Sequence, residues 1–192
     1  MLRSHITSAR GVMRRGRRPA GGSAHSPWKQ TGIHLDLVNY QREVRVDMPL
    51  LRQMGVLALP HCSDKVGGSG SVLSDLPVVE VAIVSDAVIS AVHRQFLGED
   101  SATDVVTFPY GEVIVSAETA SVNSSFYRHS PTVEIAFCLI HGLLHLNGYS
   151  DHTTLQAAKM RRRQTKILKK VHQELWLGDH TRHYWRILLH LT

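Results

Sequence analysis

Residues 130–152 read SPTVEIAFCLIHGLLHLNGYSDH, and this stretch decides the fold that we expect. Ser130 is a favoured N-cap residue, Pro131 suits the first turn of a helix, and Gly148 is a typical residue just past a helix end. Between them the chain is apolar on nearly every side, which is typical of a helix buried in a protein core. The sequence therefore predicts a central buried helix around which the domain is packed.

Two histidines lie near the end of this helix, and a third follows it closely. His141 and His145 are four residues apart, so their imidazoles project from one face of a helix, one turn apart. A turn after Gly148 then brings a third imidazole, that of His152, and this pattern is typical of a metal site. The carboxylate of Asp151 is the alternative third ligand, and buried histidines without a metal are the alternative for the whole group.

Three protein ligands leave one coordination position of a zinc ion for water, which is the arrangement of catalytic sites. The pattern thus favours a metal-assisted hydrolase. Proteases of the zincin type carry a glutamate directly after the first histidine as general base. This chain has Gly142 there, which makes a protease the weakest of the candidates.

The rest of the chain alternates strand and helix patterns. We expect strands at residues 33–40, 78–84, 105–108 and 113–115, the last two joined as a hairpin, and helices at residues 48–59, 86–97, 117–128, 131–147 and 154–171. Such an order predicts an α+β (α/β-like) single domain, in which a small mixed sheet of about four strands packs with about five helices. The central helix would carry the metal ligands.

Composition separates the two ends from this domain. Residues 1–35 contain seven Lys or Arg and no acid, so most of the net charge of +6 belongs to the N-terminus. We expect residues 1–30 to be a flexible basic tail that serves as a transit peptide for an organelle, most simply the mitochondrion; a cytoplasmic protein with a basic or inert tail is the alternative. No apolar run approaches the roughly 18 residues that span a membrane, so we expect no membrane partner. Residues 173–192 show no reliable pattern.

A second cluster of charge follows the histidines. Seven cations fall within twelve residues that include no acid: Lys159, Arg161, Arg162, Arg163, Lys166, Lys169 and Lys170. A solvated helix face would explain such a run, but its place beside a metal site favours contact with RNA phosphates.

Three blocks of the chain resemble the YbeY family of metal-dependent endoribonucleases and rRNA maturation factors. They are HRQFLGEDSATDVVTFP at residues 93–109, GEVIVS at 111–116 and HGLLHLNGYSDH at 141–152. The resemblance covers roughly residues 75–172, and we expect residues 31–172 to form a YbeY-like domain. It implies a single-strand-specific endoribonuclease with one divalent metal ion, most simply zinc. It also implies an rRNA precursor as substrate, and the small ribosomal subunit and its assembly factors as partners.

Two departures from the family pattern affect the expected site. Ser150 is one residue more than the family motif H-G-x-L-H-L-x-G-Y-D-H contains, and aligning Asp-His with Asp-His makes His152 the third ligand. The arginine that the family places in its active cleft is Leu97 here, and Arg94 is the nearest replacement on the same helix face. We predict Arg94 as a catalytic residue. The alternative is an RNA-binding ribosome-assembly factor that does not cleave.

Overall fold

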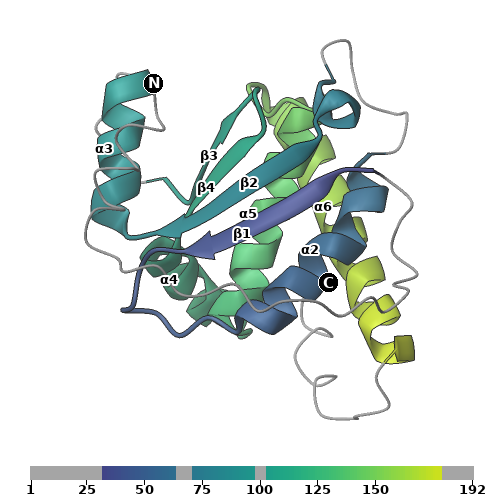
Figure 1. Ribbon diagram of the computed structural model, residues 1–192, viewed down its shortest axis with the longest axis horizontal. Helices are drawn as coiled ribbons and strands as arrows, with labels where there is room; N and C mark the ends of the chain where they lie inside the picture. Colours follow the sequence, from purple (N-terminus) through teal and green to yellow (C-terminus); the bar gives the residue numbers. More distant parts are fainter. Residues whose placement is uncertain (1–31, 64–70, 98–102, 179–192) are drawn as a thin grey trace, which may run out of the picture.

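The computed structural model describes residues 32–63, 71–97 and 103–178. In this part of the chain four strands form one sheet: β1 (His34–Asn39), β2 (Val78–Val84), β3 (Val105–Phe108) and β4 (Glu112–Ser116). Their order is β1-β2-β4-β3, with β1, β2 and β4 parallel and β3 antiparallel to β4 (Figure 1). The expected mixed sheet of four strands and its hairpin are thus confirmed.

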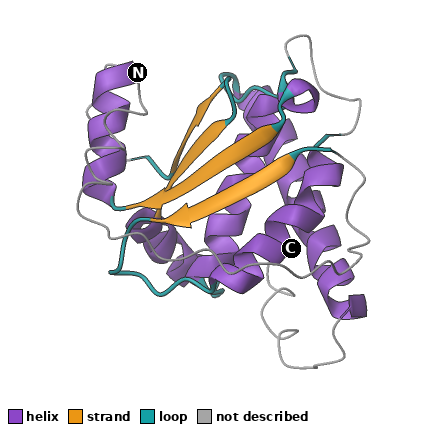
Figure 2. Ribbon diagram, in the orientation of Figure 1, coloured by secondary structure: helices purple, strands orange, loops and turns teal. Residues whose placement is uncertain are grey.

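The described residues form five α-helices, as expected. They are α2 (Met48–Cys62), α3 (Asp86–Leu97), α4 (Ala117–Tyr127), α5 (Pro131–Leu146) and α6 (Thr154–Gly178). Helices α2, α5 and α6 lie together on one side of the sheet, and α3 lies on the other (Figures 1 and 2). Within the described residues no helix is both long and apolar enough to cross a membrane.

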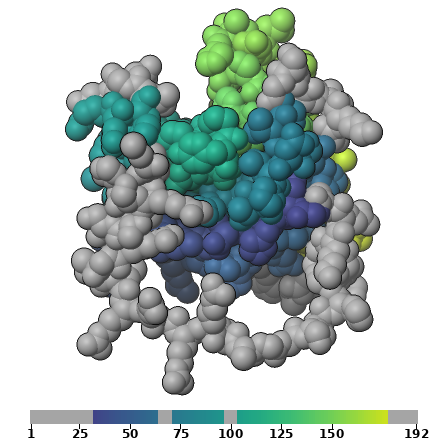
Figure 3. Space-filling view, turned by 45° about the horizontal axis from the view of Figure 1, so that its top comes forward, coloured from purple at the N-terminus to yellow at the C-terminus, as the bar shows by residue number. Residues whose placement is uncertain are grey.

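The central helix α5 begins and ends where the sequence predicts. The Ser130 side chain accepts a hydrogen bond from the backbone N–H of Val133, and Gly148, at φ +82°, follows the last turn. Most residues of α5 are buried in the main core, against α2, α6 and the sheet residues Val113 and Val115. A smaller core lies between α3 and the other face of the sheet, and it includes Ala82 and Val84 of β2 together with Val106 of β3 and Ile114 of β4. Strand β1 lies at the edge of the sheet and reaches the molecular surface (Figure 3).

Two helices are longer than predicted. We expected α2 to end at about Leu59, but it continues through Pro60 to Cys62, where the Ser63 N–H and hydroxyl both bond the Leu59 carbonyl. Proline removes one helix hydrogen bond without preventing the next turn, and buried packing on α5 and α6 offsets the loss. Helix α6 likewise runs to Gly178, beyond the expected end at residue 171. Residues 173–178 therefore belong to the domain.

Several expectations fall outside the described part of the chain. The basic tail at residues 1–30 and residues 179–192 are outside it, and so is most of the loop after α2. The structure describes Leu97 as the last residue of α3 but not its side chain.

Gly142 lets α5 approach the β3–β4 hairpin closely. A Cβ atom on this residue would lie 2.8 Å from Val113 Cγ1 and 2.9 Å from Thr107 Oγ1, which is closer than such atoms pack. We expect Gly142→Ala to lower the free energy of unfolding by about 1–3 kcal/mol, although alanine is the better helix former by about 1 kcal/mol. Urea unfolding followed by circular dichroism measures this change.

The matched control is the double variant with Val113→Ala, which removes one of the two contacts. If the clash is the cause, the double variant should be more stable than the sum of the single changes predicts. An unchanged or higher stability of Gly142→Ala would contradict the close contact.

Candidate metal centre

His141 and His145 lie in the last two turns of α5 and face the same side. Their rings meet edge to face with centroids 4.5 Å apart, and their Nε2 atoms are 2.9 Å apart. The helix spacing of four residues produces this convergence, as the sequence predicts. Both side chains are partly exposed, at 21% and 29%.

The third side chain in this group is Asp151. After Gly148 the chain turns back, and Asp151 Oδ2 lies 3.3 Å from His141 Nε2 and 3.7 Å from His145 Nε2. His152 is exposed and does not belong to this group. The structure thus brings together the helical pair and the carboxylate that was the alternative third ligand. Ligation by His152, which the sequence analysis predicts, is decided by the metal affinities of single variants.

A backbone carbonyl orients the imidazole of His145. Its Nδ1 lies 3.0 Å from the carbonyl oxygen of Tyr149, which can only accept a hydrogen bond. Nδ1 therefore carries the proton, and the lone pair of Nε2 faces His141 and Asp151. Hydrogen bonding of the distant ring nitrogen is the usual arrangement of a metal-binding histidine.

The spacing of these donor atoms fits a single metal ion. Bonds of about 2.0–2.1 Å in tetrahedral geometry place neighbouring ligand atoms about 3.3 Å apart. The three distances of 2.9, 3.3 and 3.7 Å lie around that value. The side-chain exposure of Asp151, 36%, leaves the group accessible from outside. The residues present therefore suit one divalent ion with an open position.

The pKa of His145 is lowered, mainly because burial penalises the charged imidazolium, with a further contribution from the charge of His141. Asp151 and the Tyr149 carbonyl act in the opposite direction. The neutral, metal-binding form should therefore persist below the ordinary histidine pKa of about 6.5. In an NMR titration of the metal-free protein, we expect the His145 ring to titrate below that pH. A midpoint above it would show that Asp151 dominates.

A cleft of about 420 Å³ adjoins the metal group, between α4, α5 and α6. His141 and Asp151 line one end, and its walls include Asp104, Asn123, Tyr127, Glu134, Phe137 and Arg161. Glu134 is almost fully buried and pairs with His129, whose Nε2 lies 3.0 Å from Glu134 Oε2. Of these wall residues the sequence analysis indicated only Arg161, as one of the seven clustered cations. Asn123 and Tyr127 come from α4, and no motif marks them.

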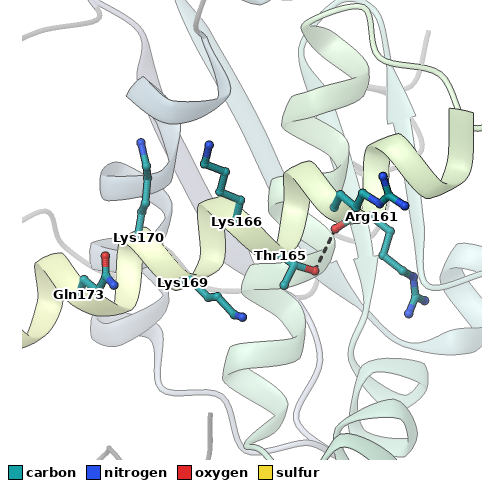
Figure 4. Close-up of a pocket in the computed structure, with 7 residues that line it drawn as sticks. Arg161, Thr165, Lys166, Lys169, Lys170 and Gln173 are labelled. Atoms are coloured by element: carbon teal, nitrogen blue, oxygen red, sulfur yellow. Dashed lines mark hydrogen bonds between the residues drawn. The ribbon is translucent and has the colours of Figure 1, made fainter. Parts of the chain in front are cut away.

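Five of the seven predicted RNA-binding cations form one surface on α6. Arg161, Arg162, Lys166, Lys169 and Lys170 line a groove of about 580 Å³ with Thr165 and Gln173, and no carboxylate is among the described residues of that groove (Figure 4). We call these five residues the cationic surface. The other two cations make different contacts: Arg163 is half-buried and donates to the His61 carbonyl at 2.9 Å, and Lys159 lies over the Tyr149 ring.

Arg94 is on a helix that contributes no residue to the metal group, the cleft or the cationic surface as described. It is in the last turn of α3, which packs on the face of the sheet opposite α5. Arg94 is not among the described residues that line the cleft beside the histidines. Its catalytic role stays a prediction, and the helix spacing that suggested it could not show which face of the sheet α3 covers.

Comparisons with known proteins agree with the geometry. The family model described as endoribonuclease YbeY matches residues 39–172. The chain is similar to the endoribonuclease YbeY of Carboxydothermus hydrogenoformans, with 31% identity over 69% of this chain and 94% of that protein. It is also similar to the endoribonuclease YbeY of Helicobacter pylori, with 34% identity over 58% of this chain and 84% of that protein.

A solved structure has a similar fold. The solution structure of TM1509 from Thermotoga maritima matches with a TM-score of 0.52 and 25% identity, over 76% of this chain and 93% of that one. The family match extends from β1 to α6 and includes the two histidines, Asp151 and the cationic surface. The chain belongs to the endoribonuclease YbeY family.

Proposed function

We propose that this protein is a metal-dependent endoribonuclease that cleaves single-stranded RNA during maturation of small-subunit rRNA. The observation that carries the proposal is the open group of His141, His145 and Asp151 beside a cleft that continues into the cationic surface of α6. Relatives at 31–37% identity bear the name endoribonuclease. We also propose an organellar, most simply mitochondrial, location and small-subunit assembly factors as partners.

Zinc is the metal that we propose. Two imidazoles and one carboxylate are a common donor set for catalytic zinc. A divalent ion held there supplies Lewis-acid catalysis, since it polarises a phosphodiester and activates water near neutral pH. The chain's own part is to orient the donors: the Tyr149 carbonyl fixes the His145 ring, and the turn at Gly148 presents Asp151.

The cationic surface supplies RNA affinity in this proposal. Its five cations extend from a single helix, and a sugar–phosphate backbone that follows the helix could contact several of them in turn. Binding of this kind releases counterions and weakens steeply as salt concentration rises. It carries no sequence preference, so any preference must come from the cleft.

A second candidate is an RNA-binding assembly factor that does not cleave. The observation that favours it is Leu97, which stands where the family has its cleft arginine, together with the position of Arg94 across the sheet. A zincin-type protease has no such support, because Gly142 packs against the hairpin and offers no general base.

Cleavage and binding assays separate the two candidates. Zinc-loaded wild type is incubated with a labelled 20-nucleotide single-stranded RNA and with the same RNA in a duplex, and His145→Ala serves as the metal-site variant. We expect wild type to cut the single strand internally and the duplex poorly, whereas the variant binds RNA without cutting it. Equal RNA binding by both proteins with no cleavage by either would support the assembly factor instead.

A further inference from the structure

The cleft beside the metal group is large enough to hold part of a substrate. Its volume of about 420 Å³ lies within the range of roughly 300–1,000 Å³ that is typical of small-ligand sites. His141 and Asp151 line one end, so a molecule in the cleft lies against the metal group. Metal binding requires only the end of the cleft at His141 and Asp151. It does not explain the residues that form the remaining walls.

Arg161 connects the cleft with the cationic surface. Among the described residues that line the cleft it is the single lysine or arginine, and it also lines the groove of the cationic surface. Figure 4 shows it at one end of the row that continues through Lys166 to Lys170. A guanidinium can hold two oxygens of one phosphate. A strand bound along α6 would therefore enter the cleft at Arg161.

The interior of the cleft favours a neutral group that donates hydrogen bonds. Asp104 and Glu134 both line it, and ionised carboxylates only accept hydrogen bonds. His129 Nε2 pairs with Glu134 Oε2, and the Cys138 thiol lies 3.9 Å from Asp104 Oδ2. The second oxygen of each carboxylate can therefore accept a hydrogen bond from a ligand. These charges repel a phosphate from the interior. A nucleobase that presents N–H groups is attracted there.

Aromatic side chains complete the walls. Phe137 lines the cleft from α5, and Tyr127 lines it from the end of α4, where it is 41% exposed and stacks on His129 with ring centroids 6.0 Å apart. Unpaired bases stack on such rings, and stacking requires that the base be free of a duplex. The walls thus suit a base from a single strand.

We propose that this cleft binds one nucleotide of the RNA, next to the bond that is cleaved. The base lies inside against Phe137 and Tyr127, and its phosphate binds Arg161. Two carboxylates in the interior favour bases with an exocyclic amino group, and guanine, which donates from two adjacent nitrogens, most of all. Uracil, with one N–H, is disfavoured. The inference rests on the proposed nuclease function, since that function makes RNA the ligand.

Nucleotide binding tests the inference without a cleavage step. Calorimetry with zinc-loaded protein compares guanosine 5′-monophosphate, uridine 5′-monophosphate and inorganic phosphate. For wild type we expect the guanine nucleotide to bind most tightly. Arg161→Gln should weaken its binding by roughly tenfold or more, because a charged hydrogen-bond pair is lost. Arg42→Gln is the matched control, since Arg42 is exposed and lines neither the cleft nor the α6 groove, and we expect a change of less than about twofold, as for a screened surface charge.

Equal affinity for the two nucleotides, or equal weakening by the two arginine variants, would overturn the subsite. Inorganic phosphate binding as tightly as the nucleotide would do so as well, because the base would then contribute nothing. The cleavage assay on wild type is read separately. If wild type cuts RNA but binds nucleotides independently of Arg161, the subsite fails and the nuclease stands; if it binds them as expected but cuts no RNA, the subsite stands and the nuclease fails.

Discussion

His145→Ala is expected to lower metal affinity by at least about 100-fold, since the loss of an outer partner of a metal ligand alone typically costs about 10- to 100-fold. The change removes one of two imidazole donors, whose Nε2 lies 2.9 Å from that of His141. The side chain is 29% exposed, so its loss opens no closed cavity and the domain should remain folded. Metal content after dialysis, measured by mass spectrometry, reports the result.

The matched control is His34→Ala, an exposed histidine at the start of β1 that does not belong to the metal group. We expect it to retain one equivalent of metal. If His145→Ala also retained a full equivalent with unchanged affinity, the metal would be bound elsewhere.

The second large effect concerns the third ligand. Asp151→Ala should weaken metal binding by about 100-fold, because the structure places its carboxylate 3.3 Å and 3.7 Å from the two histidine nitrogens. His152→Ala should change the affinity by less than about tenfold, as expected of a nearby residue that is not a ligand. Titration of each metal-free variant with zinc against a competing chelator gives both affinities.

The reverse order of these effects would restore the ligand set that the family motif implies. In that case Asp151 would be the residue that orients the turn. The backbone around the extra residue Ser150 would then rearrange when the metal binds, so that His152 reaches it. The comparison is informative because the two side chains are adjacent and the two substitutions are both to alanine.

Local signals predicted most of the fold. Ser130, Pro131 and Gly148 set the limits of α5, and the apolar run between them predicted its burial. The turn at residues 109–111 predicted an antiparallel hairpin, and β3 pairs with β4 in that way. Pro60 misled the prediction because proline weakens a helix locally, whereas the packing of α2 on α5 and α6 decides where it ends.

The candidate site was only partly accessible from the sequence. Helix periodicity brought His141 and His145 together, since both are on one helix. The choice between Asp151 and His152 depends on the path of a turn, which residue spacing does not determine. The cleft combines side chains of α4, α5 and α6, so Asn123, Tyr127 and Arg161 become neighbours only in the folded chain. Arg94, in contrast, was predicted to belong to the site, but α3 packs on the opposite face of the sheet from α5.

The most direct test of the account is the rate of RNA cleavage as zinc is added stepwise to metal-free protein. We predict that internal cleavage of a single-stranded RNA by wild type rises from zero and saturates at about one equivalent of metal, as expected of a single catalytic site. His145→Ala should show no cleavage at any ratio near that point. A rate that is independent of added metal, or that rises equally in the variant, would contradict the claim that the α5 histidines hold a catalytic metal ion.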